Sequence, residues 1–104
     1  MNRSRMVIII IVASFCIISL LYFFTGTPDG SEIFKREGCI NCHSFKGRGG
    51  SAGPDLTSIT EIKDSHWIRN QIKNPKKHNP NSRMPEFRDL SWKEIQALIK
   101  YLKT

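Results

Sequence analysis

Cysteine and histidine are scarce in this chain of 104 residues, which has three of each. Cys16 lies inside a long apolar run, so Cys39 and Cys42 are the only cysteines outside it. Two cysteines separated by only two residues close a very small loop, which argues against a disulfide framework. A structural zinc site takes four ligands, usually from two separated pairs, and His66 and His78 do not have the spacing of a second pair.

Acidic residues are also few, and all nine follow residue 28. Fourteen of the sixteen lysines and arginines lie in the same part of the chain, which therefore carries a formal net charge of +5. A basic surface suits acidic proteins, anionic lipid or nucleic acid. The sequence contains no helix-turn-helix, finger or RNA-binding signature, so we expect no nucleic-acid partner.

Charge is absent from Met6 to Phe24, nineteen residues that are almost all apolar. As a helix with a rise of about 1.5 Å per residue, this run is roughly 28 Å long, close to the ~30 Å hydrocarbon core of a bilayer. Arg3 and Arg5 precede the run, and no charge follows it until Asp29. The positive-inside tendency then predicts a single-pass segment with its N-terminus in the cytoplasm.

A cleaved signal peptide is the alternative for this segment. Its apolar core is usually about 7–15 residues and ends in a small-x-small cleavage site, whereas this run is longer and ends in bulky aromatics. Phe15 also stands where lipid attachment at Cys16 would require a small residue. We therefore expect a retained membrane anchor over residues 1–24, a linker over 25–29 and a domain over 30–104. That domain would lie on the periplasmic, extracytoplasmic face of the cytoplasmic membrane.

Two helices are predicted at the start and middle of the domain. Asp29 is a helix cap, with Glu32 in the capping-box position, and Gly38 is a typical stop. Asp64 caps a second helix, and Pro75 ends it because the residue before a proline is displaced from helical geometry.

The last helix is the clearest, since Ser91 caps it and Glu94 completes a capping box. Its apolar residues recur at helical spacing: Ile95, Leu98, Ile99 and Leu102. Residues 44–58 and 75–89 are rich in glycine and proline and are expected to be loops. No segment alternates as a strand does. The pattern predicts an all-α domain whose long loops are wrapped around something, because so small a domain has little core of its own and usually needs a staple, a metal or a large cofactor.

The cofactor is indicated by Cys39-Ile40-Asn41-Cys42-His43, the C-x-x-C-H signature of covalent haem attachment. Two thiols at this spacing add to the two vinyl groups of one porphyrin, and the adjacent histidine binds the iron. A thioredoxin-like redox pair is the alternative, but it needs a βαβ context that is absent here. We expect one haem c held by Cys39 and Cys42, with His43 as an iron ligand.

A second iron ligand is expected from Met84, because methionine is the usual partner in cytochromes c. Met1 begins the chain and Met6 begins the apolar run, so Met84 is the only methionine in the domain. It lies in a proline-rich loop, away from any apolar stripe, which argues against a role as core filler. His78 and His66 are competing ligands, on a solvated turn and on the first turn of the middle helix.

The domain resembles the monohaem class I cytochromes c over nearly all of residues 29–104. Five features agree in order: Gly30 and Phe34; Cys39 to His43; Gly53-Pro54-Asp55-Leu56; Met84-Pro85; and Leu98, Tyr101 and Leu102. The resemblance implies the class I fold, with three main helices and long loops around one haem, preceded here by one transmembrane helix.

The resemblance also implies roles for individual residues. Gly30 permits a close crossing of the first and last helices, and the carbonyl of Pro54 orients His43. The haem pocket would be lined by Leu56, Trp67, Ile72 and Phe87. Trp67 and Arg69 are possible partners of the haem propionates, and a core aromatic is the alternative for Trp67.

The implied function is electron transfer, without enzymatic activity of its own. The chain would carry single electrons between membrane redox complexes, such as a quinol-oxidising complex and a terminal oxidase or reductase. The alternative is a fixed haem-c subunit of a terminal oxidase or of a complex like nitric oxide reductase. A peroxidase or gas sensor would need an open iron site, which Met84 argues against. Docking through an acidic surface of the partner would use a basic group on the two loops: Lys46, Arg48, Lys76 and Lys77.

Overall fold

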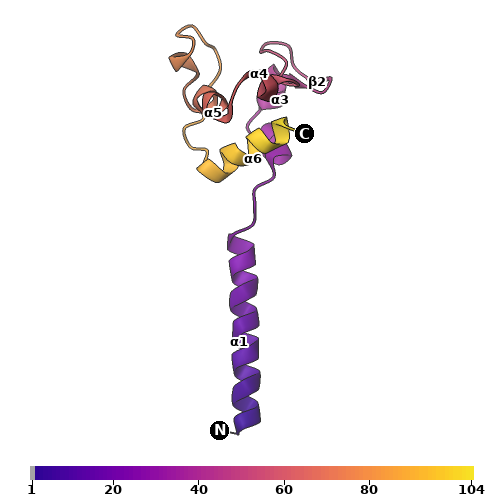
Figure 1. The fold of residues 1–104 in the computed structure, drawn as a ribbon, viewed down its shortest axis with the longest axis vertical. Helices are drawn as coiled ribbons and strands as arrows, with labels where there is room; N and C mark the ends of the chain where they lie inside the picture. Colours follow the sequence, from indigo (N-terminus) through magenta and orange to yellow (C-terminus); the bar gives the residue numbers. More distant parts are fainter. Residues whose placement is uncertain (1) are drawn as a thin grey trace.

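A computed structural model describes residues 2–104 of the chain. A long N-terminal helix stands apart from a smaller head formed by all the other elements (Figure 1). In chain order the elements are α1 (Arg3–Phe24), α2 (Gly30–Arg36), α3 (Cys39–Cys42), β1 (Ser44–Phe45), β2 (Arg48–Gly49), α4 (Ile59–Ile62), α5 (Ser65–Lys73), the 3-10 helix η1 (Pro75–Lys77) and α6 (Trp92–Leu102).

Helix α1 has 22 residues and no buried side chain. Its length, about 33 Å at 1.5 Å per residue, and its composition suffice to cross a membrane. The apolar side chains of α1 are exposed on every side, from Met6 to Phe24, so the helix has no polar face for water.

Helices α2 and α6 cross in the head, as the resemblance implies (Figure 1). The crossing is close because residue 30 has no side chain. A Cβ at Gly30 would overlap the backbone of Ala97, with the Ala97 carbonyl carbon at 2.6 Å, and would lie 2.8 Å from the Cβ of Tyr101.

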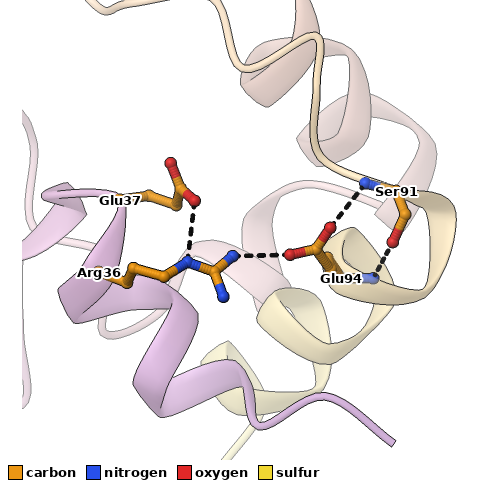
Figure 2. A network of polar contacts seen from close by, with 4 residues as sticks. All are labelled: Arg36, Glu37, Ser91 and Glu94. Carbon is orange, nitrogen blue, oxygen red and sulfur yellow. Dashed lines mark hydrogen bonds and ion pairs between the residues drawn. The ribbon is translucent and has the colours of Figure 1, made fainter. Parts of the chain in front are cut away.

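Polar contacts join the same two helices at their rim (Figure 2). The guanidinium of Arg36 donates to Glu94 at 2.6 Å and to Glu37 at 3.1 Å. The other carboxylate oxygen of Glu94 accepts from the backbone N–H of Ser91, whose hydroxyl accepts from the Glu94 N–H. Glu94 therefore completes the N-terminal capping box of α6 and also links α6 to the C-terminal end of α2 through Arg36.

An aromatic cluster fills the angle between α2, α6 and the short β1–β2 hairpin. The rings of Phe34 and Tyr101 have centroids 5.6 Å apart, and those of Phe45 and Tyr101 are 4.9 Å apart. The buried core around them is entirely apolar: Ile33, Phe34, Phe45, Ile68, Ile72, Leu90, Ile95, Leu98, Ile99 and Leu102. The predicted apolar face of α6 is thereby confirmed.

The predicted caps are confirmed at α5 and α6 and only partly at α2. Asp64 accepts from the backbone N–H of Trp67 at 2.7 Å, and α6 has its full capping box. Asp29 accepts from the N–H of Ser31 at 2.9 Å, but within residues 2–104 Glu32 returns no bond to it. Helix α2 therefore has an N-cap but not the reciprocal bond of a capping box.

The expected loop over 44–58 contains a hairpin that the sequence analysis did not predict. Ser44 pairs with Gly49 and Phe45 with Arg48 in an antiparallel register. The turn has two residues with positive φ, Lys46 at 51° and Gly47 at 79°, as a tight hairpin turn requires. Strands of two residues are too short for a visible alternation, and the domain remains all-α in class.

Candidate functional site

The C-x-x-C part of the motif forms the short helix α3, directly after Gly38 in the left-handed region at φ 76°, and His43 follows as an extended C-cap residue. Cys39 is half-buried and Cys42 is exposed, and both thiols are free. Burial raises the pKa of the Cys39 thiol, since the charged thiolate is poorly solvated there. The single turn places the two sulfurs on one short element beside His43.

The imidazole of His43 is oriented by a backbone carbonyl. Its Nδ1 lies 2.7 Å from the carbonyl oxygen of Pro54. A carbonyl oxygen can only accept, so Nδ1 carries the hydrogen and Nε2 is left as the metal-binding nitrogen.

Gly53 shapes the space around the same ring. Its N–H donates to the Cys42 carbonyl at 2.7 Å. A Cβ at Gly53 would lie 2.6 Å from Cε1 and 2.8 Å from Nδ1 of His43. Glycine is therefore needed here for space, because the loop and the ring touch.

The glycine-rich loop also packs on the backbone of α3. The N–H of Gly50 donates to the carbonyl of Ile40 at 2.9 Å, and a Cβ at Gly50 would lie 2.7 Å from the carbonyl carbon of Asn41. The loop thus covers the attachment helix by direct backbone contact, a role that the pattern of glycines alone did not reveal.

Leu56 is held at the far end of this loop. Its N–H donates to the Ser44 carbonyl at 2.9 Å, and its side chain packs, half-buried, against the core. Asp55 accepts from the N–H of Thr57 at 2.7 Å and from the hydroxyl of Ser44 at 3.0 Å. Hydrogen bonds from Thr57 and Ser44 lower the pKa of Asp55.

Gln71 and His78 connect Met84 with Trp67. The sequence pattern did not predict this connection. The amide nitrogen of Gln71 lies 3.6 Å from the sulfur of Met84, and the amide oxygen lies 2.8 Å from Nδ1 of His78. The His78 ring stacks on Trp67, with centroids 4.5 Å apart and planes 4° apart. Trp67 and Gln71 are four residues apart in α5, the helical spacing that could have indicated a shared face.

Each competing histidine has a hydrogen-bond partner, Asn70 for His66 and Gln71 for His78. Nε2 of His66 lies 3.0 Å from the Asn70 amide, and both His66 and His78 are exposed. Arg69, considered as a propionate partner, has its guanidinium carbon 3.8 Å from the ring centroid of Trp92, on the side of α6. Its Nε atom is buried and has no hydrogen-bond partner among residues 2–104.

The chemistry of these donors suits a covalent haem. Two thiols are available on one turn, and an imidazole has its Nδ1 engaged and its Nε2 available. Several partly buried apolar side chains pack against the core and would be available to line a haem: Ile40, Leu56, Ile59, Trp67, Met84 and Phe87. The overlap that a Cβ at Gly53 would cause shows that the fit around His43 is tight.

The basic residues of the two loops fall into separate groups. Lys46 and Arg48 line a hollow of about 340 Å³ with Tyr101 and Thr104. Lys76 and Lys77 form η1 together with Pro75, next to His78, and are exposed.

Another hollow, of about 440 Å³, is mainly acidic and is lined by Arg36, Glu37, Glu86, Phe87, Asp89, Leu90 and Glu94.

Fold and site together define a haem-binding α-helical domain of the class I type. The family model for cytochrome c matches residues 28–104. The chain is 30% identical over 88 residues to cytochrome c oxidase subunit 2 of Alkalihalophilus pseudofirmus, covering 77% of this chain and 26% of that protein. It is 30% identical over 86 residues to a subunit of nitric oxide reductase from Halomonas halodenitrificans, covering 71% and 55%. It is also 30% identical over 79 residues to CcoP, a subunit of the cbb3-type cytochrome c oxidase of Helicobacter pylori, covering 71% and 27%.

The chain belongs to the cytochrome c family, as a membrane-anchored monohaem member. The family carries covalent haem c, for which Cys39, Cys42 and His43 are the attachment motif, and its function is electron transfer. The expected fold class and cofactor are confirmed. The chain spans between about a quarter and about half of the length of these curated relatives.

Proposed function

We propose that this protein is the electron-transferring haem-c component of a membrane redox chain, with His43 and Met84 as the two iron ligands. The observation that carries the proposal is the contact between Nδ1 of His43 and the carbonyl of Pro54, beside the two free thiols of α3. This arrangement leaves Nε2 of His43 available for iron, next to the two thiols that would attach the porphyrin. When bound, the haem supplies an iron that alternates between its ferrous and ferric states.

The surrounding residues have distinct tasks in this proposal. Cys39 and Cys42 hold the porphyrin covalently, and Pro54 maintains the orientation and basicity of His43. Leu56 and Trp67 exclude water, which disfavours the additional positive charge of the ferric state. The sulfur of Met84 would supply the second protein ligand to the haem iron, so that the same two side chains would hold the iron in both oxidation states.

The arrangement of the chain adds a membrane location. Residues 1–24 act as the anchor, 25–29 as the linker and 30–104 as the haem domain, with the N-terminus inside and the domain on the periplasmic face. Five linker residues reach at most about 18 Å, so the haem domain stays near the membrane surface. Encounters with membrane complexes then take place in a plane and at a high effective concentration.

The redox partners in this proposal are membrane complexes, reached through an acidic docking surface on the partner. A shuttle between a quinol-oxidising complex and a terminal oxidase or reductase is the leading form. A fixed subunit is a second candidate function, because the three relatives named above are themselves described as subunits of an oxidase or a reductase.

The ligand assignment is tested by the absorption spectrum of the oxidised, haem-loaded full chain in detergent. We expect a sulfur-to-iron charge-transfer band that Met84→Ala abolishes and that His66→Ala and His78→Ala leave in place. Cys39→Ala and Cys42→Ala should each weaken covalent haem staining in a denaturing gel. A wild-type spectrum without the band would refute Met84 as a ligand.

The carrier and subunit forms are separated by purification from native membranes in mild detergent. If the protein is a fixed part of a complex, it co-purifies in constant ratio with a large membrane protein through several columns. If it is a shuttle, it elutes alone, and haem staining of the fractions distinguishes the two results.

A further inference from the structure

The sulfur of Met84 has a polar neighbour that comes from a different element. Gln71 lies on α5, and its amide nitrogen is 3.6 Å from that sulfur. A thioether is a weak acceptor and cannot donate, so the contact requires the NH₂ end of the amide to face it. Gln71 and Met84 are both partly buried, which protects the contact from competing water.

The opposite end of the same amide is also engaged. Nδ1 of His78 lies 2.8 Å from the amide oxygen of Gln71. That oxygen can only accept, so Nδ1 must carry a hydrogen, and the amide then turns its NH₂ toward Met84. The two contacts require the same amide orientation, and each supports the other.

His78 is itself held in place by an aromatic neighbour. Its ring lies parallel to Trp67, at 4.5 Å between centroids, and the Lys63 ammonium lies 4.7 Å from the Trp67 ring. The imidazole is exposed, yet the stack restricts its rotation. The chain of contacts therefore runs from Trp67 through His78 and Gln71 to the sulfur.

The backbone of the Met84 loop is anchored to the same helix. The N–H of Phe87 donates to the carbonyl of Ile72 at 3.0 Å, and the N–H of Met84 donates to the hydroxyl of Ser82 at 3.3 Å. The loop is thus fixed to α5 three residues after the methionine, at Ile72, which follows Gln71 in sequence, and the Ser82 bond restrains the loop locally at Met84 itself. The side-chain contact does not depend on a freely moving loop.

We propose that Gln71 is a positioning residue for the sulfur of Met84 and that His78 maintains the amide orientation this requires. The proposal rests on the proposed function, in which Met84 is an iron ligand. A thioether sulfur has two lone pairs, so one can bind iron while the other accepts the Gln71 hydrogen.

Two consequences follow for the loaded protein. The positive end of the amide dipole beside the sulfur disfavours the ferric state, so Gln71 raises the reduction potential. The same bond stabilises the sulfur in its place and therefore lowers the affinity of the protein for an added ligand that would replace it. A purely structural residue would change stability without shifting the potential.

The test compares matched variants of the haem-loaded full chain in detergent. Gln71→Leu keeps the size of the side chain but has no hydrogen to donate. Gln71→Glu offers only an acceptor and a negative charge at neutral pH. Asn70→Leu is the control, because Asn70 is the adjacent amide on α5, also contacts a histidine (His66), and has no contact with the sulfur.

We expect the reduction potential to fall in Gln71→Leu and to fall further in Gln71→Glu, with Asn70→Leu close to wild type. The affinity of the ferric protein for added imidazole should rise several-fold in Gln71→Leu. Where Gln71→Leu fails to retain haem, His78→Phe serves instead, since it keeps the stack on Trp67 and removes the hydrogen. Its potential should shift in the same direction by a smaller amount.

Two results would overturn the proposal, and they are distinguishable. An intact charge-transfer band with an unchanged potential and unchanged imidazole affinity in Gln71→Leu, or in His78→Phe where that variant replaces it, rejects the role of Gln71 alone. A wild-type protein without the band rejects Met84 as a ligand, and the role of Gln71 with it.

Discussion

Gly30 of α2 lies directly against the backbone of Ala97 in α6, so that any side chain at residue 30 would overlap that peptide group. The contact joins the first helix of the head, α2, to its last helix, α6 (Figure 1). Both helices contribute most of their apolar residues to the same core. The close packing of α2 on α6 therefore depends on the absence of a Cβ at residue 30.

Gly30→Ala is expected to destabilise the folded domain strongly. Added bulk in a packed core typically costs about 1–3 kcal/mol, and a clash with backbone rather than with a flexible side chain belongs at the upper end of that range. Denaturant unfolding of the haem-loaded protein measures the effect. Gly26→Ala is the control, since a Cβ there meets its nearest atoms at 3.8 Å. Equal stability of the two variants would contradict the close crossing.

Gly53→Ala is expected to disturb the haem site more than the fold. The new methyl group would press on Cε1 and Nδ1 of His43, and relief requires the ring to leave the carbonyl of Pro54. Loss of that bond lowers the basicity of His43, so the visible spectrum and the reduction potential should both change. Far-ultraviolet circular dichroism should keep its helical signal. A variant with the wild-type potential would argue that Pro54 does not tune His43.

The Arg36–Glu94 contact should contribute stability that depends on pH (Figure 2). Hydrogen bonds from the Ser91 backbone and from Arg36 lower the pKa of Glu94 below its ordinary value of 4.5. A group with a lowered folded pKa stabilises the fold above its unfolded pKa, and this stabilisation is lost as the pH falls through the folded value.

Glu94→Gln tests this dependence, because it keeps an oxygen for the Ser91 N–H and removes the charge. The variant should be less stable than wild type at neutral pH, and the difference should narrow as the pH is lowered below 4.5. Thermal melts over this range measure it. Glu32→Gln, on the exposed side of α2, should show no such convergence. If Glu94→Gln stays less stable than wild type in acid by the same amount, the loss of stability comes from packing and not from the charge of Glu94.

The elements with local signals could be predicted from the sequence. Asp64 and Ser91 begin α5 and α6 as expected, because a cap is chosen by residues within one turn of it. The β1–β2 hairpin was missed because it depends on positive φ at Lys46, a residue type that rarely adopts it. Helix α4 has a single turn, too short for a visible period.

Contacts between distant residues could be predicted only where the family pattern supplied them. Gly30 and the last helix are an example, since the resemblance already implied their crossing. Gln71 and Met84 were not paired, because their meeting depends on the path of residues 74–83 through η1 and the turn after it. No local pattern specifies such a path.

The two basic groups of the haem domain should contribute unequally to docking. Lys76 and Lys77 are exposed on η1, in the segment between Gln71 and Met84, whereas the ammonium of Lys46 lies 5.5 Å from the Phe45 ring and 3.4 Å from the Thr104 hydroxyl. The first pair therefore lies on an exposed turn of the same segment that leads from Gln71 to the proposed iron ligand Met84. The second pair, Lys46 and Arg48, faces the C-terminal end of α6.

Two double variants, K76E/K77E and K46E/R48E, change the net charge equally and so separate position from total charge. We expect the first to slow electron exchange with an acidic redox protein by about tenfold at low ionic strength, because local charge steers the encounter. Salt slows the wild-type exchange because it screens exposed charges beyond about 10 Å at 0.1 M. The exchange rate of K76E/K77E should depend much less on salt, because the charges that attract the partner are gone. The second variant should show a smaller change. Stopped-flow kinetics of the detergent-solubilised full chain over a range of salt concentrations measures both, and equal slowing in the two variants would mean that net charge alone governs the encounter.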